Sequence, residues 1–292
     1  MLKNVLLLIL VSMTWGIAFA VLKIAEYDFK AITVMACRCS IGFIILLIVS
    51  IAQKRDIRGN LKHFWMFLLF SLLGIVVCWI LLAEGLEYTS ASIGSIMDAS
   101  IPIFTYAILL FILRTEKFEV LGITGLIVAL VGLFFTVGYK KILAGDSTTL
   151  GFILLTGSFF SFALNAIIME RIAKGIDVVV TTTYVLGISS VLLWLIAIVT
   201  ERPLASRISD IDLLSEFYLG VLVSAGGYFI YYYLIQKAGA YFTSMMFYMI
   251  PIFGVIGGAL LLKEKISYNQ MLGMVVVFIG LYIVNREKFK NQ

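Results

Sequence analysis

Ten runs of mainly apolar residues, separated by short polar breaks, make up most of this chain of 292 residues. The runs lie near residues 4–22, 31–52, 64–83, 90–112, 119–138, 150–169, 178–199, 217–235, 241–262 and 268–285. A helix needs about 20 such residues to cross the hydrocarbon core of a bilayer. Lipid offers the backbone no hydrogen bonds, so long apolar runs cross it as helices. We therefore predict an all-α integral membrane protein with ten transmembrane helices.

The composition excludes a soluble protein, because 62% of the residues are hydrophobic, 13% are charged and the mean hydropathy is +1.09. The net charge of +5 is spread over short loops, which is typical of a topology signal and not of nucleic-acid binding. The three cysteines, Cys37, Cys39 and Cys78, have neither the number nor the spacing of a disulfide framework or a zinc site. We expect the lipid bilayer as surroundings and no cofactor, metal ion or nucleic-acid partner.

The distribution of Lys and Arg predicts the orientation of the chain. With a cytoplasmic N-terminus, thirteen of the 22 Lys and Arg residues lie on the cytoplasmic side and eight on the opposite side. Segments rich in Lys and Arg remain in the cytoplasm, and the loop at residues 54–62 is the strongest such anchor. We predict a multi-pass protein of a bacterial inner membrane with both termini in the cytoplasm.

The chain contains an internal repeat. Ile-Pro-Ile-Phe at residues 101–104 recurs at residues 250–253, an offset of 149, and Glu-Lys at residues 116–117 recurs at residues 264–265, an offset of 148. Each half holds five spans, and an odd number inserts the second half upside down relative to the first. Inverted repeats are the architecture of alternating access. We predict one compact transmembrane domain whose five-helix halves are residues 1–145 and 146–292.

Motifs along both halves resemble those of one transporter family. In the first half they are Trp15-Gly16, Lys23, Arg38, Gly-Leu-Glu-Tyr-Thr-Ser-Ala at residues 85–91, Pro102 and Glu116. In the second half they are Ala-Gly-Ala at residues 238–240, Pro251 and Leu-Lys-Glu-Lys at residues 262–265. With these features the sequence resembles the EamA family of the drug/metabolite transporter superfamily over essentially its whole length. The resemblance implies a ten-helix bundle with a central cavity bounded largely by the third, fourth, eighth and ninth helices, in a family that commonly exports amino acids and other small metabolites.

Arg38 and Asp98 are the clear cases of ionisable residues inside predicted spans, where a buried charge is costly and marks a candidate functional group. Both are about seven or eight residues from the same membrane face, so we expect them at similar depth. One interpretation is a structural ion pair without a ligand role. The other is that Asp98 binds a substrate ammonium or a coupling proton beside a helix kink at Pro102, four residues later, which frees the carbonyl of Asp98. Pro251 is the corresponding kink position of the second half.

Aromatic residues supply candidate walls for a substrate cavity. Trp79 and Tyr228 are 149 positions apart, so the pseudo-two-fold axis of the repeat would set them across one cavity. Tyr232 follows one turn after Tyr228 on the same helix face. Such rings hold apolar groups, or cations by cation-π attraction, and packing or interfacial roles are the alternative. Trp15 and Asn165, inside the first and sixth spans, are further candidates.

Other residues near the ends of the spans allow more than one interpretation. Glu84, at the end of the third span, is either a second negative group for a bound cation or a solvated helix end. Glu116 and Glu264 match the family motif, and we expect them to make capping and loop contacts. Gly254 and Gly258 form a small-xxx-small face that predicts close helix packing.

Missing motifs weigh against the alternatives of a membrane enzyme and a passive channel. The chain has one His and lacks His-Glu-x-x-His, a paired-aspartate phosphate motif, a Ser nucleophile between glycines and a Walker loop. It also lacks the repeated polar ring or filter-like loop of a channel. We predict a secondary transporter that moves an amino acid or related amine-bearing metabolite by alternating access, with export favoured and a proton or solute gradient as the driving force. The sequence specifies no oligomeric state.

Overall fold

The computed structural model describes residues 2–26, 30–114, 120–137, 147–201, 209–244 and 246–290. Within these ranges, seven helical segments are long and apolar enough to cross a membrane, and three shorter apolar helices accompany them. The first half contains α1 (Leu2–Ala25), α2 (Ala31–Ala52), η1 (Arg58–His63), α3 (Phe64–Ser71), η2 (Leu72–Val76), α4 (Val77–Glu87), α5 (Ala91–Asp98), α6 (Ile101–Ala107), η3 (Ile108–Ile112) and α7 (Val120–Val137). The second half contains α9 (Ser147–Ile172), α10 (Val178–Thr200), α11 (Asp210–Phe217), η5 (Tyr218–Gly227), α12 (Tyr228–Ser244), α13 (Met246–Leu261) and α14 (Tyr268–Lys290). The predicted all-α architecture is confirmed.

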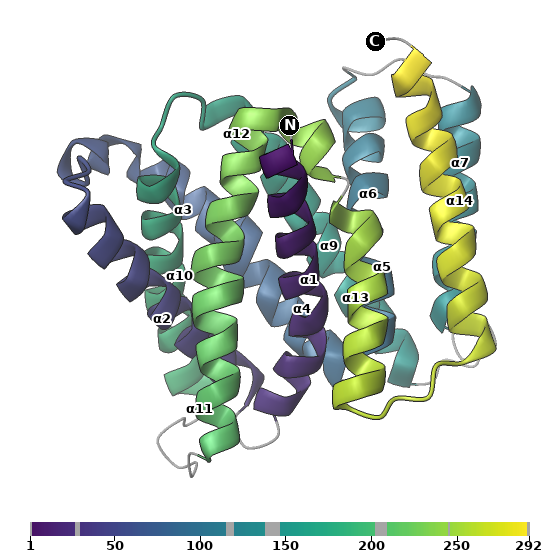
Figure 1. Cartoon of the computed structure of the whole chain (residues 1–292), viewed down its shortest axis with the longest axis horizontal. Helices are drawn as coiled ribbons and strands as arrows, with labels where there is room; N and C mark the ends of the chain where they lie inside the picture. The colour runs from purple at the N-terminus through teal and green to yellow at the C-terminus, as the bar shows by residue number, and fades with distance from the viewer. Residues whose placement is uncertain are drawn as a thin grey trace.

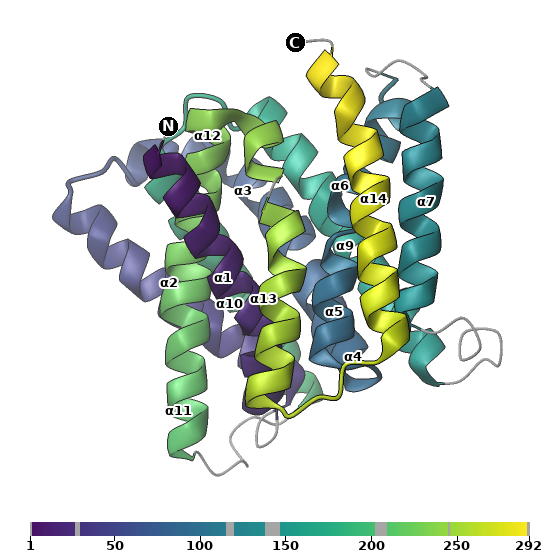
Figure 2. The ribbon, with the colours of Figure 1, turned by 45° about the vertical axis from the view of Figure 1, so that its right-hand side comes forward.

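The two halves enter the bundle from opposite sides (Figures 1 and 2). The N-terminal end of α1 and the C-terminal end of α14 lie on the same side of the bundle, whereas α9, the first helix of the second half, begins on the other side. We call the side with both termini, Arg55 and Asp177 the terminal face. The side with Glu26, Glu201 and Glu264 is called the opposite face.

The eighth span begins earlier than the sequence predicts. The apolar run suggested a start near residue 217, with residues 201–216 as a polar break, but α11 already begins at Asp210. The Ser209 side chain accepts a hydrogen bond from the Asp212 amide, and the Asp212 carboxylate accepts one from the Ser209 amide, which together form a capping box. This local signal brings Glu216 inside the helix.

Two of the long spans contain π-helical segments at equivalent positions of the repeat. η2 covers residues 72–76, and an offset of 149 carries these residues to 221–225, inside η5. A π-turn widens the helix and leaves backbone carbonyls free for other donors. The fourth span is interrupted differently, because α5 ends at Asp98 and α6 begins at Ile101 with Pro102 in its first turn. α13 runs through Pro251 without a comparable break.

Glycines bring α13 into close contact with α5, as the small-xxx-small prediction requires. A Cβ atom at Gly254 would lie 2.1 Å from the Ser95 Cβ, and one at Gly258 would lie 2.5 Å from the Ser92 hydroxyl. Larger residues at these positions would push the two helices apart.

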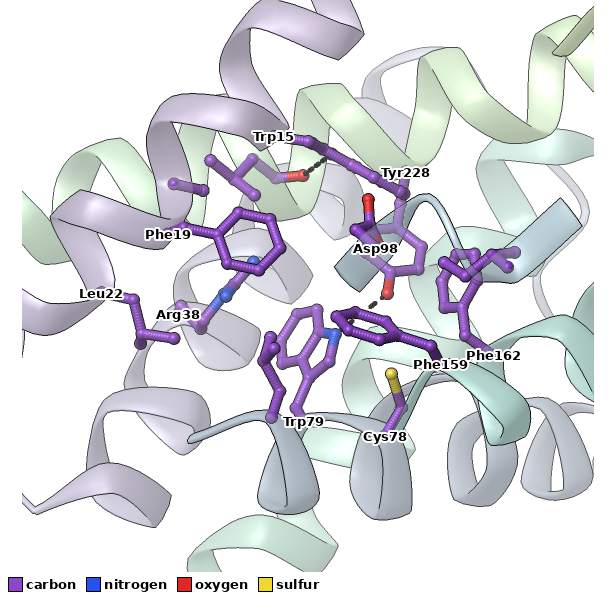
Figure 3. Close-up of a pocket in the computed structure, with 14 residues that line it drawn as sticks. Trp15, Phe19, Leu22, Arg38, Cys78, Trp79, Asp98, Phe159, Phe162 and Tyr228 are labelled. Atoms are coloured by element: carbon purple, nitrogen blue, oxygen red, sulfur yellow. Dashed lines mark hydrogen bonds between the residues drawn. The ribbon is translucent and has the colours of Figure 1, made fainter. Parts of the chain in front are cut away.

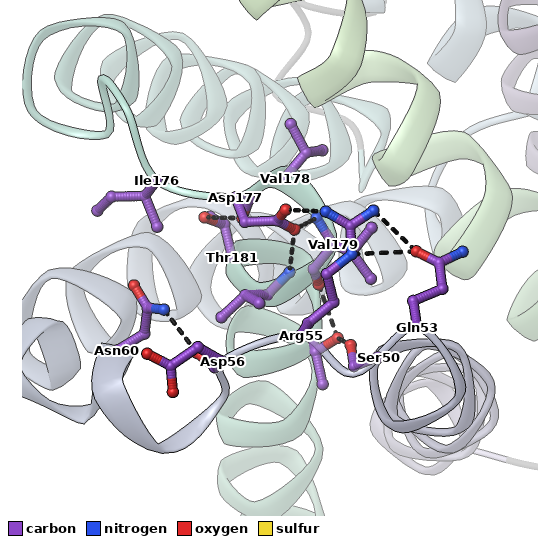
Figure 4. Close-up of polar contacts among 12 residues, drawn as sticks. Ser50, Gln53, Arg55, Asp56, Asn60, Ile176, Asp177, Val178, Val179 and Thr181 are labelled. Atoms are coloured by element: carbon purple, nitrogen blue, oxygen red, sulfur yellow. Dashed lines mark hydrogen bonds and ion pairs between the residues drawn. The ribbon is translucent and has the colours of Figure 1, made fainter.

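Polar contacts join α2 and α10 at both ends. On the opposite face, the Glu201 carboxylate at the end of α10 accepts hydrogen bonds from the amides of Ile32 (2.9 Å) and Thr33 (2.7 Å), the first turn of α2. On the terminal face, Asp177 caps α10 through the amides of residues 179 and 180 and forms an ion pair with Arg55, just past the end of α2 (Figure 4). Each helix therefore holds an end of the other.

Candidate functional site

A central cavity of about 70 Å³ lies between the two halves of the bundle (Figure 3). Both halves contribute to its wall, which consists of Trp15, Ala18, Phe19, Leu22, Arg38, Cys78, Trp79, Leu82, Asp98, Ile101, Phe159, Phe162, Val223 and Tyr228. The family resemblance led us to expect lining from the ninth helix, but α13 contributes none of these described residues. α1 and α9 line the cavity instead, because α13 packs through its glycines against the outer side of α1 and α5.

Arg38 places a buried guanidinium in the cavity wall. Only 4% of the residue is exposed. Its Nε donates to the Ser224 hydroxyl at 3.1 Å, and its Cζ lies 3.8 Å from the centre of the Trp79 ring, a cation-π contact. Ser224 belongs to η5, so the π-helix of the second half positions the arginine of the first. The guanidinium has further N–H donors for a ligand, since its other contact is a weak one from Nη1 to the Met35 sulfur.

Asp98 lines the same cavity without pairing with Arg38. Asp98 is 6% exposed, and within the described ranges its carboxyl group makes no salt bridge and no hydrogen bond. In Figure 3 Arg38 lies to the left of Trp79 and Asp98 to the right. The structural ion pair weighed from the sequence is therefore not formed in this structure. A basic and an acidic side chain instead line one small cavity without contacting each other.

Trp79 and Tyr228 meet directly in the cavity wall. The Trp79 Nε1 donates to the Tyr228 hydroxyl at 3.1 Å, and the two rings are T-shaped with centroids 5.7 Å apart. The Tyr228 hydroxyl donates in turn to the carbonyl of Gly74 in η2, at 3.2 Å. Trp15 packs on Tyr228 with a centroid distance of 5.2 Å, and its Nε1 donates to the carbonyl of Val223 in η5, at 3.3 Å.

Three residues predicted at the site lie outside the cavity wall. Tyr232 contacts Tyr228 edge to face, and its hydroxyl, beside a separate pocket near Met169 and Gln236, is buried and has no hydrogen-bond partner in the described part of the chain. Asn165 is buried against Gly74, where a Cβ atom would lie 2.4 Å from its Nδ2. Glu84 is half-buried on α4, towards the opposite face.

Acidic residues gather on the opposite face around the end of α1. Burial raises the pKa of Glu26 to about 8, and the negative charges of Glu87, Glu84 and Glu201 add to this effect while Lys23 opposes it. The Lys23 amine donates to the carbonyl of Thr89. Glu84 is therefore one member of an acidic rim and not an isolated helix end.

Glu216 is the residue that sequence reasoning missed. It is 6% exposed, and both carboxylate oxygens are buried without a hydrogen-bond partner among the described residues. Glu216 lies on α11, which continues into η5, the helix whose Ser224 hydroxyl accepts a hydrogen bond from Arg38. The signal was the capping pattern Ser209 to Asp212, which starts the helix before Glu216.

Comparison with known proteins decides the family. The profile of the EamA-like transporter family matches the chain twice, over residues 2–138 and 149–286. The chain belongs to this family. It is 22% identical to the uncharacterised transporter YoaV of Bacillus subtilis, over 97% of each chain. It is 28% identical to an uncharacterised transporter of Synechocystis, over 95% of this chain and 88% of the relative.

A solved crystal structure shares the fold of this EamA-like transporter. It is 12% identical in sequence, covers 99% of each chain and superposes with a TM-score of 0.72. The WAT1-related protein At3g02690 of Arabidopsis thaliana is 25% identical over 93% of this chain and 66% of its own length. Family membership identifies the protein as a multi-pass membrane transporter and not an enzyme, and it confirms the predicted pair of repeats.

Proposed function

We propose that this chain is a secondary transporter that carries zwitterionic metabolites, chiefly amino acids with apolar side chains, by alternating access. The observation that carries the proposal is that a basic and an acidic side chain, Arg38 and Asp98, line one cavity and are not paired with each other in the described part of the chain. A buried charge without a counter-charge is costly, and a bound ligand of complementary charge offsets that cost.

The chemistry of the two side chains fits both ends of an amino acid. Arg38 retains guanidinium donors for an α-carboxylate, and such charge-assisted hydrogen bonds are stronger than neutral ones. Asp98 offers acceptors to an α-ammonium. A zwitterion carries both charges on neighbouring atoms and can bridge two groups that do not reach each other.

The remaining wall favours an apolar substituent. Trp15, Phe19, Trp79, Phe159 and Phe162 surround the charged groups with aromatic surface. A volume of about 70 Å³ has room for a few water molecules only, so lining side chains or helices must move to admit a metabolite. Required movement supports a carrier over the alternative of an open channel.

The proposed location is a bacterial inner membrane with the terminal face in the cytoplasm, and the family resemblance favours export. The excess of Lys and Arg on the terminal face supports this orientation. Single cysteines at Gly175 and Lys265, in a variant without Cys37, Cys39 and Cys78, test it in whole cells. A membrane-impermeant thiol reagent should label the second position only, and labelling of Gly175→Cys alone would reverse the orientation.

Counterflow in proteoliposomes tests the substrate class. Proteoliposomes that contain the transporter and are loaded with unlabelled L-phenylalanine should accumulate labelled L-phenylalanine from the medium. Phenethylamine, which lacks the carboxylate, and 3-phenylpropionate, which lacks the ammonium, should compete at least about tenfold more weakly, because each leaves one buried charge unsatisfied. Counterflow with none of the apolar amino acids, or equal competition by both analogues, would overturn the proposal.

A further inference from the structure

The most unusual buried group outside the cavity wall is the carboxylate of Glu216. It lies in α11, two residues before the first residue of the π-helix η5, and only 6% of the residue is exposed. Neither oxygen has a hydrogen-bond donor among the described residues. An ionised carboxylate in such surroundings lacks the donors that normally stabilise it, whereas a carboxylic acid carries no charge to stabilise.

The charged and titratable groups around Glu216 come from each element that packs on α11, namely α1, α2 and η5. On its own helix Asp212 is engaged in the capping box with Ser209. On α2 the titratable side chains that interact with Glu216 are Cys37, Arg38 and Cys39, of which only Arg38 is a cation.

The other two elements supply no competing charge. The Lys23 amine of α1 is turned to the carbonyl of Thr89, and the Tyr218 hydroxyl of η5 donates to the carbonyl of Thr14 at 2.9 Å. Arg38 is the positive group tied to the helix of Glu216, because its Nε donates at 3.1 Å to the Ser224 hydroxyl of η5, which continues α11.

Resting on the proposed function, we propose that Glu216 is a proton-binding site of the transporter, linked to the substrate site through Arg38. When Glu216 is ionised, its negative charge partly neutralises Arg38 and competes with a substrate carboxylate. When Glu216 takes up a proton from solvent and becomes a neutral acid, Arg38 is left to the substrate. The proton forms one O–H bond at the carboxylate, and no other bond changes.

This linkage makes proton binding and substrate binding favour each other, because a coupling free energy acts equally in both directions. Proton and substrate then travel together. An inward proton gradient would then drive uptake of the substrate. Net export would require an outward substrate gradient larger than the inward proton gradient.

Calorimetric titration of the purified transporter with L-phenylalanine, in buffers of different ionisation enthalpy, measures the protons taken up on binding. The wild type should take up close to one proton at a pH where Glu216 is ionised, and Kd should rise by about tenfold per pH unit in that range. Glu216→Gln, which mimics the protonated acid, should bind without proton uptake and with a Kd independent of pH. Asp210→Asn, an exposed acid in the same helix, should behave as wild type.

Infrared difference spectra between acidic and alkaline buffer test the proton site without a substrate. The wild type and Asp210→Asn should share one component of the protonated-carboxyl band that is missing in Glu216→Gln and shifted in Glu216→Asp, whereas the component that Glu26 contributes should remain in all four proteins. An unchanged band in both Glu216 variants, or proton uptake that persists in Glu216→Gln, would overturn the proposal. Failure of every amino acid to bind, with the Glu216 band present, would count against the proposed substrate and not against the proton site.

Discussion

Trp79 and Tyr228 occupy equivalent positions in the two halves, 149 residues apart, and their side chains are hydrogen-bonded to each other at 3.1 Å. Two residues related by a two-fold axis touch only where they lie close to that axis. The pseudo-two-fold of this transporter therefore passes through the wall of the central cavity. Gly74 and Val223 share the same offset, and the carbonyl of each accepts a hydrogen bond from an aromatic side chain of the cavity. A site on the axis is suited to exposure at either membrane face.

Replacing Tyr228 by Phe tests the contact on the axis. The variant removes a hydroxyl that accepts from Trp79 and donates to Gly74, so two buried polar groups lose their partner. We expect a loss of about 1–3 kcal/mol in stability, seen as a lower Tm of the purified protein. Tyr282→Phe, whose residue is 64% exposed, is the matched control. Equal Tm values for the two variants would show that the contact does not stabilise the fold.

The unpaired state of Arg38 and Asp98 predicts the outcome of a double-variant experiment. Asp98→Asn and Arg38→Gln should each reduce L-phenylalanine counterflow more than about tenfold, and the double variant should not recover it, because each residue serves a different ligand group. Arg55→Gln with Asp177→Asn provides the comparison, since this pair is formed. Full transport by the Arg38/Asp98 double variant would assign that pair a structural role.

Glu264 should stabilise the first turn of α5. Its carboxylate accepts hydrogen bonds from the amides of Ala91 (2.8 Å) and Ser92 (3.0 Å), which confirms the capping role predicted from the sequence. Glu264→Ala should lower the stability by about 1–2 kcal/mol, measured as a drop in Tm, because it removes an anion from a helix N-terminus. The neighbouring exposed residue provides the control Lys265→Ala, and an equal drop there would contradict the assignment.

The raised pKa of Glu26 predicts a pH-dependent stability. The carboxyl group titrates near 8 in the folded protein and near 4.5 when exposed, so folding takes up a proton between these values. Stability is therefore highest on the acidic side and falls as the pH rises towards and through 8. The Tm of the wild type should drop between about pH 4.5 and about pH 8 and change little above that range, and Glu26→Gln should reduce the drop. Glu170→Gln, an exposed acid on the terminal face, should leave it unchanged.

Much of the fold follows from the sequence because the bilayer imposes simple rules. Span length, backbone satisfaction and the 149-residue offset predict ten helices in two inverted halves. The same offset predicted Trp79 and Tyr228 on opposite sides of one cavity, whereas their side chains are hydrogen-bonded to each other in its wall. Glu264 was also predictable, since a carboxylate near a helix start has a clear capping role. The division between residues 145 and 146 and the role of Glu116 stay predictions, because these residues lie outside the described ranges.

The partners of the buried charges were not predictable from the sequence. Counting residues from the membrane face placed Arg38 and Asp98 at equal depth and suggested a pair. Inside the π-helix η5 the angular positions of the side chains differ from those of an α-helix, and Ser224 of this segment, not an acid, accepts the hydrogen bond of Arg38. The hydropathy pattern alone also placed Glu216 in a loop, because a polar first turn interrupts the apolar run before the helix itself begins.

The polar contacts that join α2 and α10 at both ends have a consequence for inhibition. Arg38 lies on α2, which is bound to α10 near both ends through Glu201 and the Arg55–Asp177 ion pair. Asp98 is the last residue of α5, and the first turn of α5 is hydrogen-bonded to Glu264, which follows α13. Arg38 and Asp98 thus belong to two different pairs of helices, α2 with α10 and α5 with α13. A molecule that carries both charges joins the pairs, but one that carries a single charge and a bulky apolar group occupies one of them and leaves the other unengaged. Such molecules should act as competitive blockers that bind and are not carried.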